Sequence, residues 1–204
     1  MKKDFLLSTL FIGILLVNGC KKEPPLALFS MDKVTYKMDE TITFTNQSEN
    51  AKDYIWDFGD GKSSTDENPK HAYSSTGDFA IKLIATGGGG TDSITKTISI
   101  LPNLTGIWYK TIFFTGGAYR VTGTMNLVQH DDNTLTGSFV YDDGAGTMII
   151  RSTSIVTGNS VTIDWDIPSY SYKFQGTVIP AGNSMSGQFF GDNVLVGTWS
   201  AKKL

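Results

Sequence analysis

Reactive side chains are scarce in this chain of 204 residues, which has one cysteine and two histidines. His71 and His130 lie in different halves of the sequence, so it offers neither a histidine pair nor an HExxH zinc motif. No GxSxG segment occurs, so the strained serine turn of many hydrolases is missing. We therefore predict no catalytic residues, no cofactor and no metal ligands, and read both histidines as structural.

Basic clusters and helical patterns are also lacking. The chain has 17 basic and 20 acidic residues, a formal charge of −3, and beyond the first residues its only basic pairs are Lys21-Lys22 and Lys202-Lys203. A nucleic-acid partner is therefore not expected. No long stretch has the spacing of an amphipathic helix, and 22 glycines lie among many threonines and serines. This composition predicts an all-β protein.

The N-terminus has the pattern of an export signal. Lys2 and Lys3 precede a nearly continuous apolar run over residues 5–17, which is short for a permanent membrane helix, and Cys20 follows. The segment resembles bacterial lipoprotein signals, which implies a signal peptide over residues 1–19, lipidation of Cys20 and a tether over residues 20–25. The expected location is the cell envelope, anchored by lipid to the outer membrane on its periplasmic or surface face. The alternative is an ordinary secretory signal with a coincidental cysteine.

The most distinctive stretch is YIWDFGDG, residues 54–61. Trp56 and Phe58 alternate with Asp57, which is the period of a strand with one buried face. Gly59 and Gly61 flank an aspartate, as a tight turn requires. A second run, HAYSSTG, begins ten residues after the first ends.

Together these two motifs resemble the PKD family, whose signature is a WDFGDG strand and turn followed by HxY and a glycine-centred turn. The resemblance covers residues 26–101 and implies an Ig-like β-sandwich of about seven short strands. In that fold Trp56 and Tyr73 belong to the core, and Ile42 and Phe44 face inward. PKD-like domains commonly act as spacers or interaction modules, which is the role the resemblance implies.

Leu101-Pro102-Asn103 is the expected domain boundary, because proline cannot continue a central strand. From residue 104 to 204 an apolar residue, a hydroxyl and a glycine recur, as in Val121-Thr122-Gly123 and Met185-Ser186-Gly187. Seven turn clusters separate the apolar segments and predict eight antiparallel strands in up-and-down order. Eight such strands close readily into a barrel.

A second resemblance supports that barrel. Gly106-Ile107-Trp108, at the start of the first strand, is similar to the GxW motif of lipocalins. The resemblance implies a small calyx-like barrel around a lumen. Alternation along the strands places eight large side chains inside it: Trp108, Leu127, Phe139, Tyr141, Trp165, Tyr172, Phe174 and Phe189. They either fill the lumen or line a pocket for one small apolar ligand.

These observations favour a noncatalytic envelope protein whose barrel binds a small hydrophobic or carbohydrate ligand, with the first domain as a spacer. The candidate ligand-binding residues are Trp108, Tyr141, Trp165, Tyr172, Phe174 and Phe189. A second hypothesis is a structural or adhesion scaffold that contacts proteins or glycans by its outer surface, for example through Tyr109 and Phe113. A third, a glycan-acting hydrolase, requires two close carboxylates, for which Asp131 with Asp142 or Asp166 are the candidates.

Overall fold

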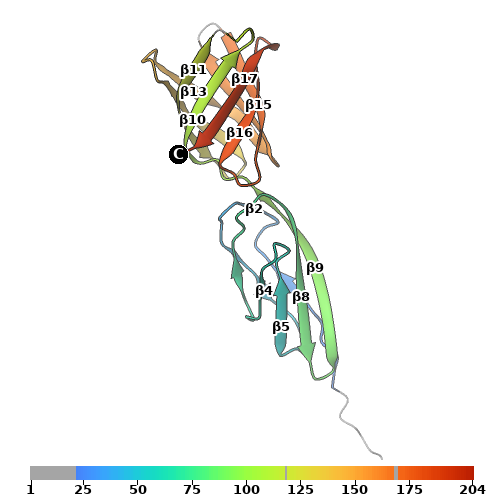
Figure 1. The fold of residues 1–204 in the computed structure, drawn as a ribbon. Helices are drawn as coiled ribbons and strands as arrows, with labels where there is room; N and C mark the ends of the chain where they lie inside the picture. Colours follow the sequence, from blue (N-terminus) through green and yellow to red (C-terminus); the bar gives the residue numbers. More distant parts are fainter. Residues whose placement is uncertain (1–21, 118, 168–169) are drawn as a thin grey trace, which may run out of the picture.

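The computed structural model describes residues 22–117, 119–167 and 170–204, and over these ranges the chain is entirely β-structure in two domains (Figure 1). Both the all-β prediction and the predicted pair of architectures are confirmed. Within the same ranges, no helix has the length and apolar character needed to span a bilayer. Cys20 lies outside the described residues.

The first domain is a sandwich of seven short strands and two long ones. Its strands are β1 (Phe29–Ser30), β2 (Thr35–Lys37), β3 (Ile42–Thr43), β4 (Thr45–Asn46), β5 (Asp53–Asp57), β6 (Ser63–Ser64), β7 (Lys70–His71), β8 (Gly77–Gly87) and β9 (Gly90–Leu101). A five-stranded sheet has the order β2-β9-β8-β5-β6, and the pairs β1-β4 and β3-β7 form two smaller sheets. All pairings are antiparallel except β2 with β9.

Aromatic rings fill the core of this sandwich. Trp56 of β5 is fully buried, and its ring centroid lies 5.1 Å from that of Phe29 and 5.7 Å from that of Phe44. The Trp56 indole N–H donates to the Asp66 carbonyl at 2.9 Å, so burial leaves no donor unpaired. Tyr73 is buried as well, and its hydroxyl donates to the Phe58 carbonyl at 2.8 Å. The core positions predicted from alternation are therefore confirmed, Ile42 and Phe44 included.

The turn after β5 has the conformation its glycines predict. Gly59 and Gly61 have φ of 77° and 84°, a region that glycine adopts without strain. Asp60, between them, accepts a hydrogen bond at 2.8 Å from His71, whose ring stacks on Phe58 with centroids 4.2 Å apart. Partial burial raises the pKa of Asp60, but the bonds from His71 and the Lys62 backbone N–H outweigh it and hold the pKa below its usual value. His71 is structural, as predicted.

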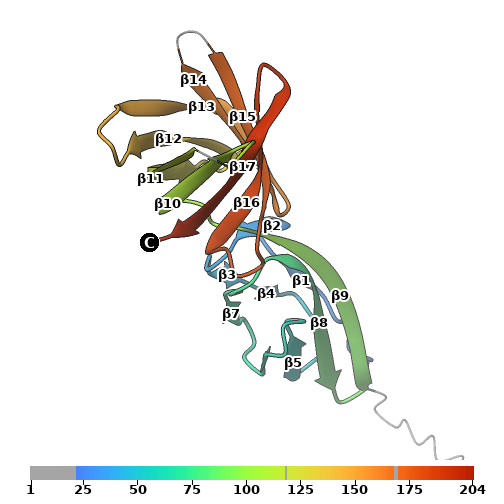
Figure 2. The ribbon, with the colours of Figure 1, turned by 45° about the horizontal axis from the view of Figure 1, so that its top comes forward.

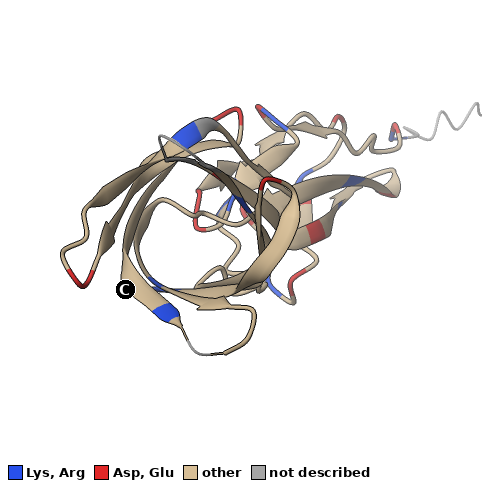
Figure 3. Cartoon of the chain, turned by 90° about the horizontal axis from the view of Figure 1, so that it is seen from above, with Lys and Arg blue, Asp and Glu red and all other residues tan. Residues whose placement is uncertain are grey.

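The second domain is a closed barrel of eight antiparallel strands, each paired with the next along the chain (Figure 3). The strands are β10 (Gly106–Phe114), β11 (Arg120–Gln129), β12 (Thr134–Tyr141), β13 (Thr147–Thr157), β14 (Ser160–Ile167), β15 (Tyr170–Val178), β16 (Ser184–Gly191) and β17 (Val194–Lys203). Pairing of β10 with β17 closes the ring. The predicted up-and-down order is confirmed.

Two of the recurring glycines have a packing role inside this barrel. A Cβ added at Gly123 would lie 2.5 Å from Phe139 Cζ, and one at Gly197 would lie 2.5 Å from Phe189 Cε1. Each glycine therefore leaves room for an aromatic ring from a neighbouring strand. The repeat seen in the sequence thus lets a narrow barrel hold large rings.

The two domains lie end to end (Figures 1 and 2). Thr76 N–H donates to the Pro180 carbonyl at 3.0 Å, and the Lys37 ammonium contacts Gln129 O at 3.3 Å and Asp131 Oδ1 at 3.1 Å. These partners belong to hairpins at one end of the barrel, hereafter the proximal end. Lys22 contacts Gly88 at the tip of the β8–β9 hairpin, which is the opposite end of the sandwich. The distal end of the barrel therefore faces away from residue 22.

Candidate ligand-binding site

The proximal end of the barrel is sealed by its own side chains. Leu104, Trp108, Leu127 and Leu135 are fully buried there. Trp108 Nε1 donates to the Leu104 carbonyl at 2.8 Å, and Gln129 Oε1 accepts from the Leu104 N–H at 2.9 Å. Every polar atom in these contacts has a partner, so this end is a filled core.

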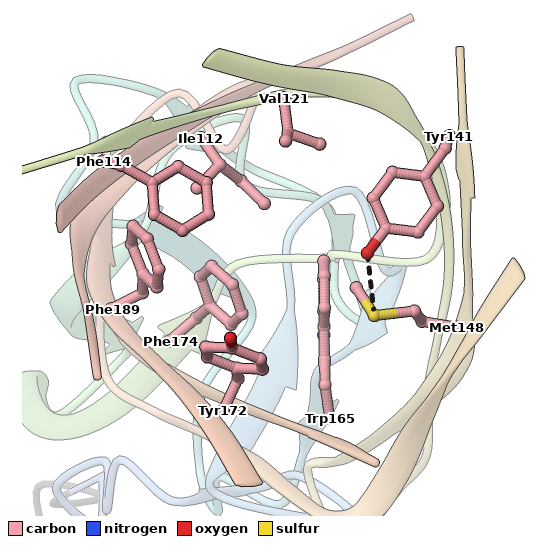
Figure 4. Close-up of a pocket in the computed structure, with 9 residues that line it drawn as sticks. All are labelled: Ile112, Phe114, Val121, Tyr141, Met148, Trp165, Tyr172, Phe174 and Phe189. Carbon is pink, nitrogen blue, oxygen red and sulfur yellow. Dashed lines mark hydrogen bonds between the residues drawn. The ribbon is translucent and has the colours of Figure 1, made fainter. Parts of the chain in front are cut away.

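The distal end contains a cavity of about 100 Å³ (Figure 4). Its walls are apolar and mostly aromatic, and they come from seven of the eight barrel strands: Ile112, Phe114, Val121, Tyr141, Met148, Trp165, Tyr172, Phe174 and Phe189. Phe174 and Phe189 are stacked with centroids 5.2 Å apart, and Phe114 meets Phe189 edge-on at 5.2 Å. An enclosure of this kind binds small apolar or aromatic molecules.

The lumen residues expected from the sequence all point inward, but they divide between the two ends. Tyr141, Trp165, Tyr172, Phe174 and Phe189 line the distal cavity, whereas Trp108 belongs to the proximal core. The lumen is therefore neither wholly filled nor an open calyx. Ile112, Phe114, Val121 and Met148 complete the cavity wall and were not among the expected ligand-binding residues. The period of a strand is consistent with inward positions for these four residues, but it does not show that a cavity lies beside them.

Lys110 is the unexpected member of the lumen. It follows Trp108 by two residues on β10, so its side chain points inward, and it is fully buried. Its Nζ lies 3.3 Å from the ring centroid of Phe174 and 3.7 Å from that of Trp165, with Trp199 at 5.0 Å and Phe139 at 5.9 Å. Phe174 and Trp165 also line the cavity, so the amine lies beneath the cavity floor. Sequence analysis did not single out Lys110, although its position between the inward-facing Trp108 and Ile112 on β10 could have identified it as a lumen residue.

This amine has no hydrogen-bond partner among the described residues. Burial lowers the pKa of Lys110 well below its ordinary value, because the charged ammonium loses its hydration. The indole Nε1 of Trp165 is also buried, and it too has no hydrogen-bond partner among the described residues. The Tyr141 hydroxyl donates at 3.1 Å only to the thioether of Met148, a weak acceptor, and burial raises its pKa. The cavity thus has donors around it and few acceptors.

The pair Asp131 with Asp142, considered for hydrolysis, is not supported. Asp131 lies in a proximal hairpin and contacts Lys37, whereas Asp142 lies at the distal end and accepts a bond from the Tyr109 hydroxyl at 3.0 Å. The side chain of Asp166 lies outside the described residues. His130 is at a hairpin, as predicted, and bonds Thr136 Oγ1 at 2.8 Å. Among the described residues, no three His, Cys, Asp or Glu side chains gather as a metal site.

A larger hollow of about 380 Å³ lies at the domain junction, next to residues such as Thr35, Asp78, Ser99 and Asn159. Its lining is mostly small and polar, and the unpaired group next to it is the neutral hydroxyl of Thr76, not an amine. The distal cavity is therefore the stronger candidate for a ligand.

Comparison with known proteins identifies the first domain. Residues 22–101 match the family model of the PKD domain, so this part of the chain is a PKD domain, as its motifs predicted. The chain is 40% identical over 72 residues to a microbial collagenase of Vibrio alginolyticus, which covers 31% of this chain and 9% of that protein. It is 31% identical over 99 residues to collagenase ColQ1 of Bacillus cereus, covering 46% and 10% respectively. The chain thus spans about a tenth of the length of these relatives.

Among solved structures, the chain is similar to the PKD1 domain of the Vibrio cholerae metalloprotease PrtV. The identity is 28% and the TM-score 0.34, over 38% of this chain and 98% of that domain.

Proposed function

We propose that this protein is a noncatalytic binding protein whose barrel takes up a small apolar or aromatic ligand at its distal end, with the PKD domain as a spacer. The observation that carries the proposal is the cavity of about 100 Å³ lined by aromatic side chains at the end of the barrel that the PKD domain leaves uncovered. For comparison, an apolar cavity of about 150 Å³, half as large again, binds benzene.

The position of the cavity also supports binding rather than core packing. The proximal core satisfies its polar atoms, whereas the distal cavity leaves Lys110 Nζ and Trp165 Nε1 unpaired. Unpaired buried donors cost about 1–3 kcal/mol each, and such a cost is commonly met at functional sites.

The test is a titration of the full chain with toluene, followed by calorimetry and by the shift in melting temperature. Val121→Phe places a ring in the cavity and is expected to abolish binding. Val140→Phe, on the exposed outer face of β12, adds the same ring and is expected to leave binding unchanged. If toluene and related one-ring compounds leave the melting temperature of the native chain unchanged, the proposal fails.

A scaffold function is the second candidate. Ile107, Tyr109 and Phe113 lie along the outer face of β10 and are 50%, 41% and 45% exposed. If a protein or glycan binds these three residues, the double variant Tyr109→Ser with Phe113→Ser is expected to lose that partner. Its affinity for toluene is expected to stay that of the native chain.

We also propose that the chain is anchored in the cell envelope by lipid on Cys20. The lipoprotein-like signal in the sequence supports this. Mass spectrometry of the mature N-terminal peptide is expected to find a diacylglyceryl group on Cys20. Unmodified Cys20 in the cell-associated protein would contradict the anchor and leave the barrel proposal intact.

A further inference from the structure

We propose that the ligand of the distal cavity carries a carboxylate, and that Lys110 and Trp165 bind it beneath an apolar or aromatic body. This inference rests on the proposed binding function and specifies the chemistry of the ligand. Its basis is that two buried donors adjoin one cavity and neither has an acceptor.

The donors have a geometric relation to the cavity. Trp165 lines the cavity, and its ring centroid is 3.7 Å from Lys110 Nζ. Phe174, the other ring against the amine, also lines the cavity. Only this ring layer separates the amine from the cavity, and a lysine side chain has four rotatable bonds with which to reach past it. An acceptor atom at the cavity floor would therefore lie next to the two rings against which the amine packs.

The apolar walls define the rest of the ligand. Above the amine the cavity is surrounded by Ile112, Phe114 and Phe189, which favour a planar or short-chain hydrocarbon body. A ligand with its carboxylate next to Lys110 and its apolar body between these walls matches both the buried amine and the apolar lining. A neutral acceptor such as an amide also accepts from these donors, but it carries no charge that could pair with an ammonium.

The charges around Lys110 explain why the acceptor is an acid. Lys110 is the one buried charged side chain among the described residues, and the rings against it come from β12, β14, β15 and β17. The titratable groups that face the lumen near it are the hydroxyls of Tyr141 and Tyr172.

One carboxylate atom of the described ranges, Asp164 Oδ1, is buried without a partner, but Asp164 alternates with the inward-facing Ile163 and Trp165 along β14 and so faces away from the lumen. Asp142, Asp143 and Asp192 belong to exposed distal hairpins, where solvent screens their charge. A ligand carboxylate therefore supplies the counter-ion that the chain does not.

Proton balance follows from this pairing. Burial lowers the pKa of Lys110, so we expect the amine of the free protein to be unprotonated, whereas a carboxylate ligand is ionised in neutral solution. Binding takes up one proton from solvent, so that an ammonium and a carboxylate face each other in the complex. The apparent affinity is then expected to fall tenfold for each unit of rising pH while the free amine stays neutral.

The experiment compares benzoate, benzamide and toluene, which share a ring and differ in the attached group. The full chain is expected to bind benzoate at least tenfold more tightly than benzamide at pH 7. Calorimetry in two buffers of different ionisation enthalpy is expected to show the uptake of one proton with benzoate and none with toluene.

Two variants make the result specific. Lys110→Met removes the amine and keeps a similar volume, and it is expected to abolish both the preference for benzoate and the proton uptake. Lys173→Met is the matched control, because Lys173 lies between Tyr172 and Phe174 on β15 but is exposed. It is expected to behave as the native chain.

The outcomes separate the two proposals. Equal binding of the three compounds, or a preference for benzoate that survives Lys110→Met, overturns the carboxylate inference while the apolar site stands. Binding of none of the three overturns the proposed function itself. Proton uptake by the native chain needs no variant, so it decides the inference even if Lys110→Met does not fold.

Discussion

Replacing Lys110 by methionine is expected to stabilise the ligand-free protein at neutral pH. In the folded state burial lowers the pKa of Lys110 well below its ordinary value, whereas in the unfolded chain a lysine keeps a pKa of about 10.4. Between these two pKa values the unfolded state binds one more proton than the folded state. The free energy of unfolding therefore rises with pH by about 1.4 kcal/mol per unit from this group alone.

The direction depends on which of two opposing effects on the ammonium is larger. The aromatic rings favour the charged form, with Phe174 and Trp165 centroids within 3.3 and 3.7 Å of Nζ. Cation–π attraction contributes about 2 kcal/mol at a desolvated site. Loss of hydration costs several kcal/mol per buried ion, and Nζ has neither a hydrogen bond nor a counter-ion. Desolvation is the larger effect, so we expect the folded amine to be neutral.

The assay is urea unfolding of the native chain and of Lys110→Met at pH 7, 8 and 9, without ligand. The variant is expected to be more stable at pH 7, and its advantage is expected to shrink by about 1.4 kcal/mol per pH unit. Lys173→Met, exposed on the outer face, is expected to show a difference that does not vary with pH. Parallel curves for the native chain and Lys110→Met would refute the reasoning, because they would mean that the ring cage holds the ammonium charged.

Two further predictions concern the PKD turn and the barrel wall. Asp60→Asn is expected to lower the free energy of unfolding of the PKD domain by about 1–3 kcal/mol at pH 7, because it weakens the bond to His71. The pKa of Asp60 is lower in the folded than in the unfolded state, so the stability difference between the native chain and the variant is fully present above the unfolded pKa. It disappears as the pH falls through the folded pKa. Urea unfolding at pH 7 and at pH 3 checks this. Gly123→Ala is expected to destabilise the barrel by more than about 2 kcal/mol, because the added Cβ would lie 2.2 Å from the Val140 carbonyl oxygen. The control is Asn126→Ala, on the exposed face of the same strand, which is expected to change stability little. Thermal unfolding of the two variants checks both expectations.

Much of the fold was predictable because short-range patterns determine it. The alternation around Trp56 gave the buried face of β5, and Gly59 and Gly61 marked its turn. The turn clusters after residue 104 gave the number and order of the barrel strands. Each of these depends on contacts between neighbours in the sequence or on the period of a strand.

The site was less predictable, because it depends on how side-chain volumes add up across the lumen. Alternation places Trp108 and Trp165 on the same inner surface, but it does not show that Trp108 packs in a filled end while Trp165 borders a cavity. The role of the glycines is of the same kind, because Gly123 makes room for a ring sixteen residues later. Lys110 was visible as a charged residue at an inward position, yet its four aromatic neighbours come from strands far apart in the sequence.

The sealed proximal end of the barrel has a kinetic consequence. Trp108 and Leu104 close that end and the PKD domain lies beyond it, so a molecule in the distal cavity can enter and leave only through the distal opening of the barrel. Binding and dissociation therefore use the same opening, and a second ligand molecule cannot displace the first toward the other end. Exchange must therefore be sequential, with the rate of departure independent of the concentration of the newcomer. Under the proposed binding function, the barrel would hold one molecule at a time and would not conduct a flow.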